Sequence, residues 1–151
     1  MSLQAIAKSF FAQPEAATFY PSSQSTQAFV TSVYNNVLSR GPDAAGLAYW
    51  TGELQSQHIS QDAFLLAIIN GAKAFPGSTD ALVLANKQSA GGHFALAQGL
   101  GNITEARAVM ALVDATAVSV TTANALTDSY ARSADTSATS ELVIQIVGLV
   151  P

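Results

Sequence analysis

The break at Gly41-Pro42-Asp43 constrains the fold of this chain more than any other stretch of the sequence. Before it, apolar residues recur every four positions in two adjacent rows, which predicts one broad buried face of an α-helix. The rows are Phe29, Val33 and Val37, and Val30, Tyr34 and Leu38. Pro42 cannot continue a helix, and Gly41 tolerates the left-handed conformation that often follows a helix end. We therefore expect the first of two packed helices to end at Gly41.

A second helix is expected to begin directly after this break. The carboxylate of Asp43 can accept hydrogen bonds from the free N–H groups of a first helical turn. Leu47, Trp50, Thr51 and Leu54 then follow at the spacing that places them on one helix face. The break is thus a corner between two helices whose apolar faces meet.

More helices are predicted on either side of residues 75–80, where Pro and Gly interrupt the pattern. Ser60 can cap a third helix before this interruption. Its apolar stripe consists of Phe64, Leu65, Ile68, Ile69 and Ala72. After it, Gly91-Gly92 interrupts a helical pattern, since each glycine inside a helix costs about 1 kcal/mol relative to Ala. Asn102 begins a capping box for another helix.

The C-terminal part is expected to hold a helix from about Ser119 to Ala131, a polar linker over 132–140 and a last short helix over 142–147. The chain as a whole predicts an all-α fold, an irregular bundle of six to eight short helices. We expect two subdomains that share a core, residues 1–76 and residues 77–151.

Composition excludes several classes of partner. Charged residues make up only 11% of the chain, the net charge is −4, and the six basic residues are scattered singly. Without a basic stripe to neutralise phosphates, nucleic-acid binding is not expected. No apolar run of 18 residues is present, so we expect no membrane insertion. The absence of cysteine excludes disulfides, thiol catalysis and cysteine metal sites.

No motif in the sequence predicts catalysis. There is no nucleophile elbow, phosphate-binding glycine loop or pair of carboxylates at a catalytic spacing. His58 and His93 are the only histidines, and neither has the partners that a zinc site needs. We therefore expect no enzyme activity, no catalytic residue, no metal and no cofactor.

The polar residues of the corner admit two interpretations. Arg40 could donate and Asp43 could accept hydrogen bonds to a sugar or a carboxylate. Alternatively, Asp43 caps the second helix while Arg40 holds nearby carbonyl groups or Asp43 itself. The structural interpretation is favoured, because Asp before a helix is common for local reasons.

The two adjacent aromatic residues of the corner cannot face the same core. Tyr49 and Trp50 point about 100° apart on a helix. Trp50 lines up with Leu47 and Leu54 and is expected in the core, whereas Tyr49 is expected at the surface, where it could contact a ligand. Gly46 is expected to allow close approach of the first helix.

Residues 29–75 resemble a bacterial module known as domain-of-unknown-function family 4214. The family pattern reads F-V-x-x-L-Y, then L-x-R-x-P-D-x-x-G-x-x-Y-W, then L-x-x-G and a closing apolar helix. Ten positions match it in order: Phe29, Tyr34, Leu38, Arg40, Pro42, Asp43, Gly46, Tyr49, Trp50 and Leu54. Two departures stand out, because Ser39 replaces a usual Gly and Gln57-His58 lie near another usual Gly.

The resemblance implies an all-helical, non-catalytic module of extracellular bacterial proteins. Relatives occur in S-layer proteins, in calcium-binding repeat proteins exported by type I systems and beside glycan-active enzymes. The expected location is therefore extracellular or at the cell surface.

Two functions follow from this resemblance as expectations. The first is anchoring or adhesion through a surface polysaccharide, of which lipopolysaccharide is one candidate, or through a protein partner. Arg40, Asp43 and Tyr49 are the candidate contact residues. The second is self-assembly with another copy of the chain, as an S-layer tile or a phycobilisome-like linker, without a small-molecule ligand.

Overall fold

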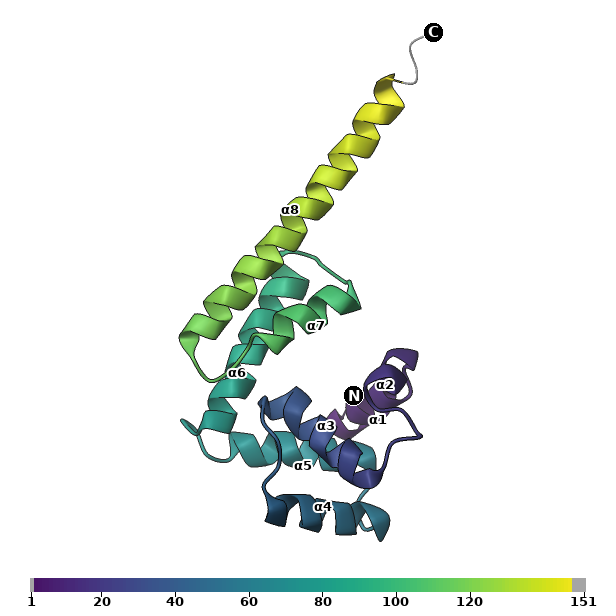
Figure 1. Cartoon of the computed structure of the whole chain (residues 1–151), viewed down its shortest axis with the longest axis vertical. Helices are drawn as coiled ribbons and strands as arrows, with labels where there is room; N and C mark the ends of the chain where they lie inside the picture. The colour runs from purple at the N-terminus through teal and green to yellow at the C-terminus, as the bar shows by residue number, and fades with distance from the viewer. Residues whose placement is uncertain (1, 148–151) are drawn as a thin grey trace. The chain divides into compact units, whose positions relative to one another are not determined.

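A computed structural model describes residues 2–147 of the chain, with the side chains of residues 2–134. Within residues 2–147 the structure contains helices and no strand, which confirms the predicted all-α fold. In chain order the helices are α1 (Leu3–Phe11), α2 (Pro14–Phe19), α3 (Thr26–Leu38), α4 (Ala44–Gln55), α5 (Gln61–Lys73), α6 (Thr79–Gly92), the π-helical segment η1 (His93–Ala97), α7 (Ile103–Ala111) and α8 (Ala117–Val147) (Figure 1).

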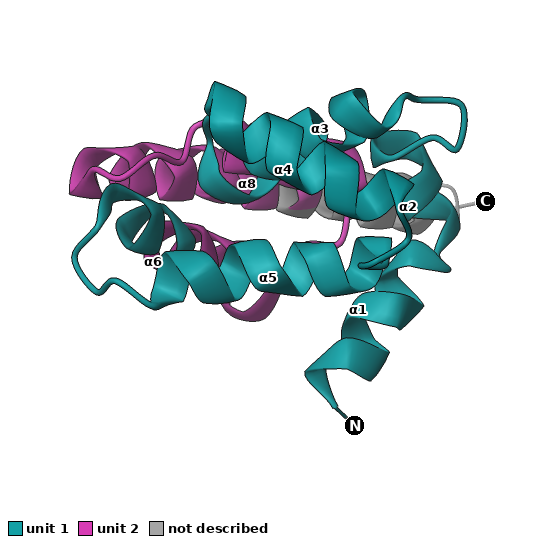
Figure 2. Ribbon diagram, turned by 90° about the horizontal axis from the view of Figure 1, so that it is seen from below, with its two compact units in different colours: residues 1–84 teal, residues 85–151 magenta. Residues whose placement is uncertain are grey.

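The chain divides into two compact units, residues 1–84 and residues 85–151, which are unit 1 and unit 2 below (Figure 2). The division falls inside α6, whereas we expected a boundary at 76/77, in the turn before that helix. Each unit has a cluster of buried side chains of its own, in place of the single shared core that we expected.

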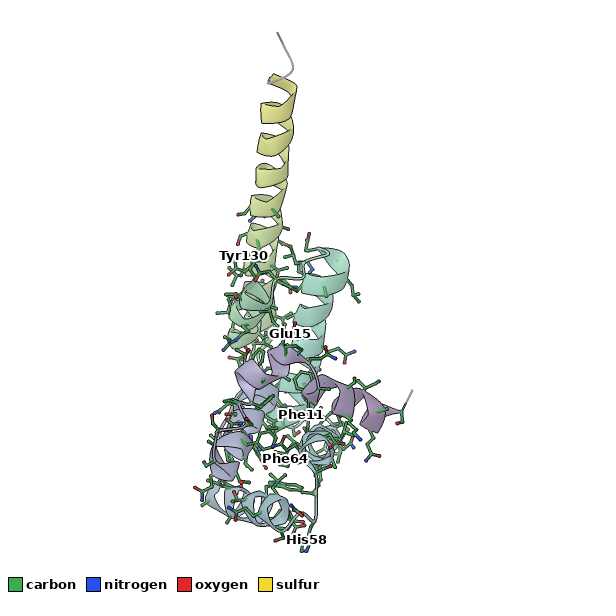
Figure 3. All side chains as sticks on the ribbon, turned by 90° about the vertical axis from the view of Figure 1, so that its right-hand side faces the viewer. Phe11, Glu15, His58, Phe64 and Tyr130 are labelled. Carbon is green, nitrogen blue, oxygen red and sulfur yellow. The ribbon has the colours of Figure 1, made fainter. Side chains whose placement is uncertain are left out.

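The core of unit 1 lies where α5 packs against α1, α3 and α4. Its buried members are Phe29, Val30, Val33, Tyr34, Leu38, Phe64, Ile68 and Ala72. Phe29 is only 2% exposed, and its ring centroid lies 5.8 Å from that of Phe64 on α5. Phe11 of α1 also contacts Phe29, and Figure 3 shows Phe11 and Phe64 among the helices of this unit. The predicted apolar rows of α3 therefore form the centre of unit 1.

The core of unit 2 is smaller. Its buried residues are Ala90, Phe94, Val109, Val113 and Ala123, and Leu126 and Tyr130 of α8 pack against them. Gly91 lies opposite α7, where an added Cβ would meet the Met110 methyl group at 3.6 Å. The predicted interruption at Gly91-Gly92 takes the form of the π-helical segment η1, which follows α6 directly.

The end of α3 differs from the prediction. The left-handed residue is Ser39, with φ 54° and ψ 28°, and its N–H donates to the carbonyl of Asn35. Gly41 has no positive φ. The physical reason is Pro42, whose ring disfavours helical conformations of the residue before it, so the helix closes earlier.

The prediction of a polar linker over 132–140 is wrong. These residues belong to α8, which is a single helix of 31 residues, and the predicted last short helix over 142–147 is its final part. No Gly or Pro occurs between residues 117 and 147. Ser and Thr lower helix propensity only by fractions of a kcal/mol, and the alanines among them restore it. A polar composition was therefore not enough to interrupt the helix.

Candidate functional site

Arg40 joins the corner between α3 and α4 to the first turn of α6. Its Nε and Nη2 atoms donate to the two carboxylate oxygens of Asp80, each at 2.7 Å. Its Nη1 donates to the carbonyl of Gly41 at 3.1 Å, and the guanidinium carbon lies 5.4 Å from the Tyr34 ring centroid. This side chain thus clamps a nearby carbonyl, as the structural interpretation predicts, and its main partner is forty residues away.

The Arg40–Asp80 pair changes the acid–base properties of both groups. The hydrogen bond from Arg40 holds the pKa of the Asp80 carboxyl below its ordinary value, while burial opposes this shift. The same hydrogen bond raises the pKa of Arg40. The Arg40 side chain remains half-exposed, so solvent screens the attraction. The pair is a structural clamp of modest strength.

Asp43 and Gly46 form the cap of α4. Asp43 Oδ1 accepts from the Gly46 N–H at 2.6 Å, which is the predicted N-cap. A Cβ on Gly46 would lie 3.2 Å from Asp43 Oδ1 and 3.4 Å from the Tyr34 hydroxyl oxygen. Gly46 therefore allows the cap and the approach of α3 at the same place. Pro42, between the two helices, is partly buried.

The two aromatic residues of α4 lie in different surroundings. Tyr49 is 58% exposed, in agreement with the helical spacing. Trp50 is partly buried at the edge of the unit 1 core, with its ring centroid 5.1 Å from that of Phe64. The Tyr49 and Trp50 rings meet edge to face at 4.9 Å. Among the described contacts, none joins Tyr49 to Arg40 or Asp43, so the three predicted contact residues do not form one described cluster.

A cavity lies elsewhere in unit 1, with a volume of about 360 Å³. The turn after α2, the start of α3, the end of α4 and the start of α5 surround it. Its lining residues are Pro21, Gln24, Thr26, Phe29, Leu54, Gln57, Ile59, Ser60 and Gln61. The polar ones are all uncharged amides and hydroxyls. Apart from Phe29 and Leu54, none belongs to the matched family positions, so the motif did not point to this cavity.

Two local features distinguish the rim of the cavity. Gln57 has φ 59°, a left-handed backbone conformation that residues other than glycine rarely adopt. Ser60 occupies the N-cap position of α5, but its side chain makes no capping hydrogen bond. The departure from the family pattern at Gln57-His58 was the one feature of the sequence that could have pointed to this cavity. The family has a Gly near this place, and the backbone conformation of Gln57 is one that favours glycine.

Neither histidine lines the cavity, although His58 lies between the lining residues Gln57 and Ile59. His58 Nδ1 is 3.5 Å from Glu53 Oε1, and its side chain is 68% exposed; Figure 3 shows it at the edge of unit 1. In unit 2, His93 Nε2 lies 2.7 Å from Asp128 Oδ1, which also accepts from Gln98 Nε2 at 2.9 Å. Within the described part of the chain, no three His, Asp or Glu side chains gather as metal ligands. No helix in that part is long and apolar enough to cross a membrane.

Residues 7–74 match the model of the family described as Domain of unknown function (DUF4214). The match confirms the resemblance seen over residues 29–75 and extends it through α2 into the second half of α1. It lies wholly within unit 1, as do the corner and the cavity. No curated protein and no solved structure shows significant similarity to the chain.

Proposed function

We propose that unit 1 is a non-catalytic binding module of an exported or cell-surface bacterial protein, and that it anchors or adheres by binding a surface glycan. The observation that carries this proposal is the cavity lined by uncharged polar residues together with apolar ones. Ligand sites combine apolar surface with a few convergent polar groups in this way, in volumes of about 300–1,000 Å³.

The chemistry of the cavity favours binding over reaction. None of its nine lining residues carries an acid, a base or a strong nucleophile. General acid–base catalysis needs a titratable group within hydrogen-bond reach of the reacting atom. Arg40 and Asp43, the other candidate contact residues, are already held by Asp80 and by the Gly46 N–H. The cavity is therefore the better candidate contact surface, with exposed Tyr49 as a secondary one.

A glycan array tests the proposal. The full chain is applied to immobilised bacterial polysaccharides, lipopolysaccharides included, beside a Gln57→Gly variant and an Arg40→Lys variant. We expect binding by the full chain that is retained when Arg40 is changed. Absence of binding to every glycan would overturn the proposal.

The extracellular location is part of the same proposal and is tested separately. Its support is the family match together with the export contexts of relatives that the resemblance implies. Antibody against the chain should label intact cells of the source organism without permeabilisation. Label confined to permeabilised cells would contradict an extracellular role.

One observation favours the alternative of self-assembly. Leu3, Ile6 and Phe10 lie at helical spacing on α1 and are 69%, 48% and 40% exposed. The same helix buries Ala7 and packs against α5, so its apolar surface is only partly covered. Exposed apolar surface of this kind can mark an interaction site. Light scattering should then show a molar mass that rises with concentration and falls to the monomer value in Ile6→Ser; a monomer at all concentrations would exclude this alternative.

A further inference from the structure

The polar residues that line the unit 1 cavity are all uncharged, and each can both donate and accept hydrogen bonds. Gln24, Gln57 and Gln61 each offer a carboxamide that donates and accepts, and Thr26 and Ser60 each offer a hydroxyl that does both. The hydroxyl groups of a sugar also donate and accept, so each can be paired by such a wall. An anionic ligand would meet no cation among the lining residues, and a cationic one would meet no carboxylate. The lining therefore matches an uncharged ligand that is rich in hydroxyl groups.

The remaining lining residues are apolar. Pro21, Leu54 and Ile59 line the cavity beside the nearly buried ring of Phe29. A sugar ring has C–H faces between its hydroxyl groups, and burial of such apolar area is favourable. The volume of about 360 Å³ lies at the lower end of the range for ligand pockets. It suits one small ring better than an extended peptide, which would also need partners for its backbone groups.

The polar groups of the wall are available to a ligand. Among the described residues, no hydrogen bond engages the side chains of Gln24, Thr26, Gln57, Ser60 or Gln61. Ser60 is the clearest case, because a serine at an N-cap position usually hydrogen bonds the first helical turn and this one does not.

The backbone at Gln57 gives an independent argument. A left-handed conformation is unfavourable for a residue with a Cβ, and glycine removes that cost. The chain nevertheless has a long amide side chain at this position, directly at the cavity. Residues held in unfavourable conformations concentrate at functional sites. Gln57 follows the end of α4, where its N–H donates to the Leu54 carbonyl, and its side chain brings to the cavity an amide that glycine would not supply.

From these observations we infer that the cavity binds a single uncharged sugar ring of a larger glycan, and that Gln57 is a specificity-determining residue. This inference rests on the glycan-binding function proposed above. The amides of Gln24, Gln57 and Gln61 select hydroxyl groups, and the apolar lining residues contact the C–H face of the ring. The lack of charge in the lining rejects uronic acids and amino sugars with a free ammonium group.

Nuclear magnetic resonance titration of the ¹⁵N-labelled full chain tests the inference. The probes are the methyl glycosides of glucose, galactose, mannose and N-acetylglucosamine, with glucuronic acid and glucosamine as charged counterparts. At least one uncharged probe should shift the side-chain amide signals of the cavity glutamines. Glucuronic acid and glucosamine should both bind at least tenfold more weakly than that probe.

The decisive variant is Gln57→Gly, because its effects on stability and on binding have opposite signs. Relief of the left-handed conformation should leave the melting temperature equal or higher, while the loss of the amide should weaken sugar binding at least tenfold. Ser39→Gly is the matched control, since Ser39 is also left-handed but does not line the cavity. This control should bind the sugar within twofold of the unchanged chain.

The outcomes separate this inference from the proposed function. If a polysaccharide binds the chain and Gln57→Gly binds it equally well, the cavity is not the site and the inference fails, while glycan binding stands. Tighter binding of a charged sugar than of its uncharged counterpart would also overturn the inference alone. If no glycan or sugar binds, both fail.

Discussion

At Gly46 a single hydrogen atom takes the place that a side chain would occupy between two neighbours. The carboxylate of Asp43 caps the helix from one side, and the hydroxyl of Tyr34 approaches from α3 on the other. A methyl group would be within 3.4 Å of both oxygens, tighter than ordinary contact. The glycine of the family pattern therefore serves packing at this corner, although glycine weakens a helix by about 1 kcal/mol relative to Ala.

Two glycine substitutions in the same helix should have opposite effects. Gly46→Ala is expected to destabilise the chain by about 1 kcal/mol or more, because the cap and Tyr34 must move. Gly52→Ala, also in α4, has no atom within 4 Å of the added Cβ and should stabilise by up to about 1 kcal/mol. Urea denaturation measures both. Stabilisation by both changes would show that Gly46 has no packing role.

The adjacent residues Tyr49 and Trp50 provide a second residue-scale prediction. Trp50→Ala should destabilise the chain by about 2 kcal/mol or more, because it removes an aromatic ring that packs against Phe64. Its half-burial places the effect below that of a fully buried tryptophan. Tyr49→Ala should change the free energy of unfolding by less than about 1 kcal/mol, since only its edge contact with Trp50 is lost. A melt that is more sensitive to Tyr49 than to Trp50 would reverse this assignment of faces.

At the scale of elements, Arg40 and Asp80 connect two helix ends. Asp80 lies in the first turn of α6, where a negative charge is favourable even without a partner. The Arg40 guanidinium adds two charge-assisted hydrogen bonds from the α3–α4 corner. The start of α6 is thereby tied to the corner within unit 1.

This connection predicts a pH dependence of stability. Because the pKa of Asp80 is lower in the folded than in the unfolded chain, the pair stabilises the fold above about pH 4, and this contribution is lost as the pH falls through the folded pKa. Asp80→Asn should cost about 0.5–1 kcal/mol at pH 7, in the range for exposed pairs, and much less at pH 3.

Chemical denaturation at the two pH values measures the difference. Asp62→Asn is the control, since Asp62 also lies in the first turn of a helix but forms none of the described ion pairs. An Asp80→Asn penalty that is the same at pH 3 as at pH 7 would contradict a role for the carboxylate charge.

The continuous α8 helix makes a prediction of its own. Ala134 is exposed and lies inside the stretch that composition alone predicts as a linker. Ala134→Pro should break the helix there, because proline removes a backbone donor and clashes with the preceding turn. The circular dichroism signal at 222 nm should decrease, and Ala134→Ser should leave it nearly unchanged. An unchanged signal in Ala134→Pro would contradict a continuous helix and support the predicted linker over 132–140.

At the scale of the whole molecule, most of the described buried apolar side chains fall into two clusters, one in each unit. The cluster of unit 1 is the larger and contains all the buried apolar residues of the family pattern. A domain with its own core can fold alone. The family match over residues 7–74 falls inside this unit.

A fragment of residues 1–92, which keeps α6 intact, should therefore fold. We expect a cooperative thermal transition and dispersed amide signals that overlay those of unit 1 in the full chain. Val33→Ala in the fragment should lower its melting temperature, since Val33 is fully buried. A fragment without a cooperative transition would show that the unit 1 core depends on the rest of the chain.

Features that depend on neighbours within one or two helical turns could be predicted from the sequence. Periodicity predicted α3, α4 and α5, and the caps at Asp43 and Asn102 form as their side-chain chemistry requires. Tertiary structure alone decided what depends on distant residues. Arg40 finds Asp80 forty positions away, and the cavity collects glutamines from separate segments that no local pattern connects. The left-handed conformations of Ser39 and Gln57 were not predicted, because each lies just past a helix end, where the backbone hydrogen bonds that close the helix outweigh the preference of a single residue for negative φ.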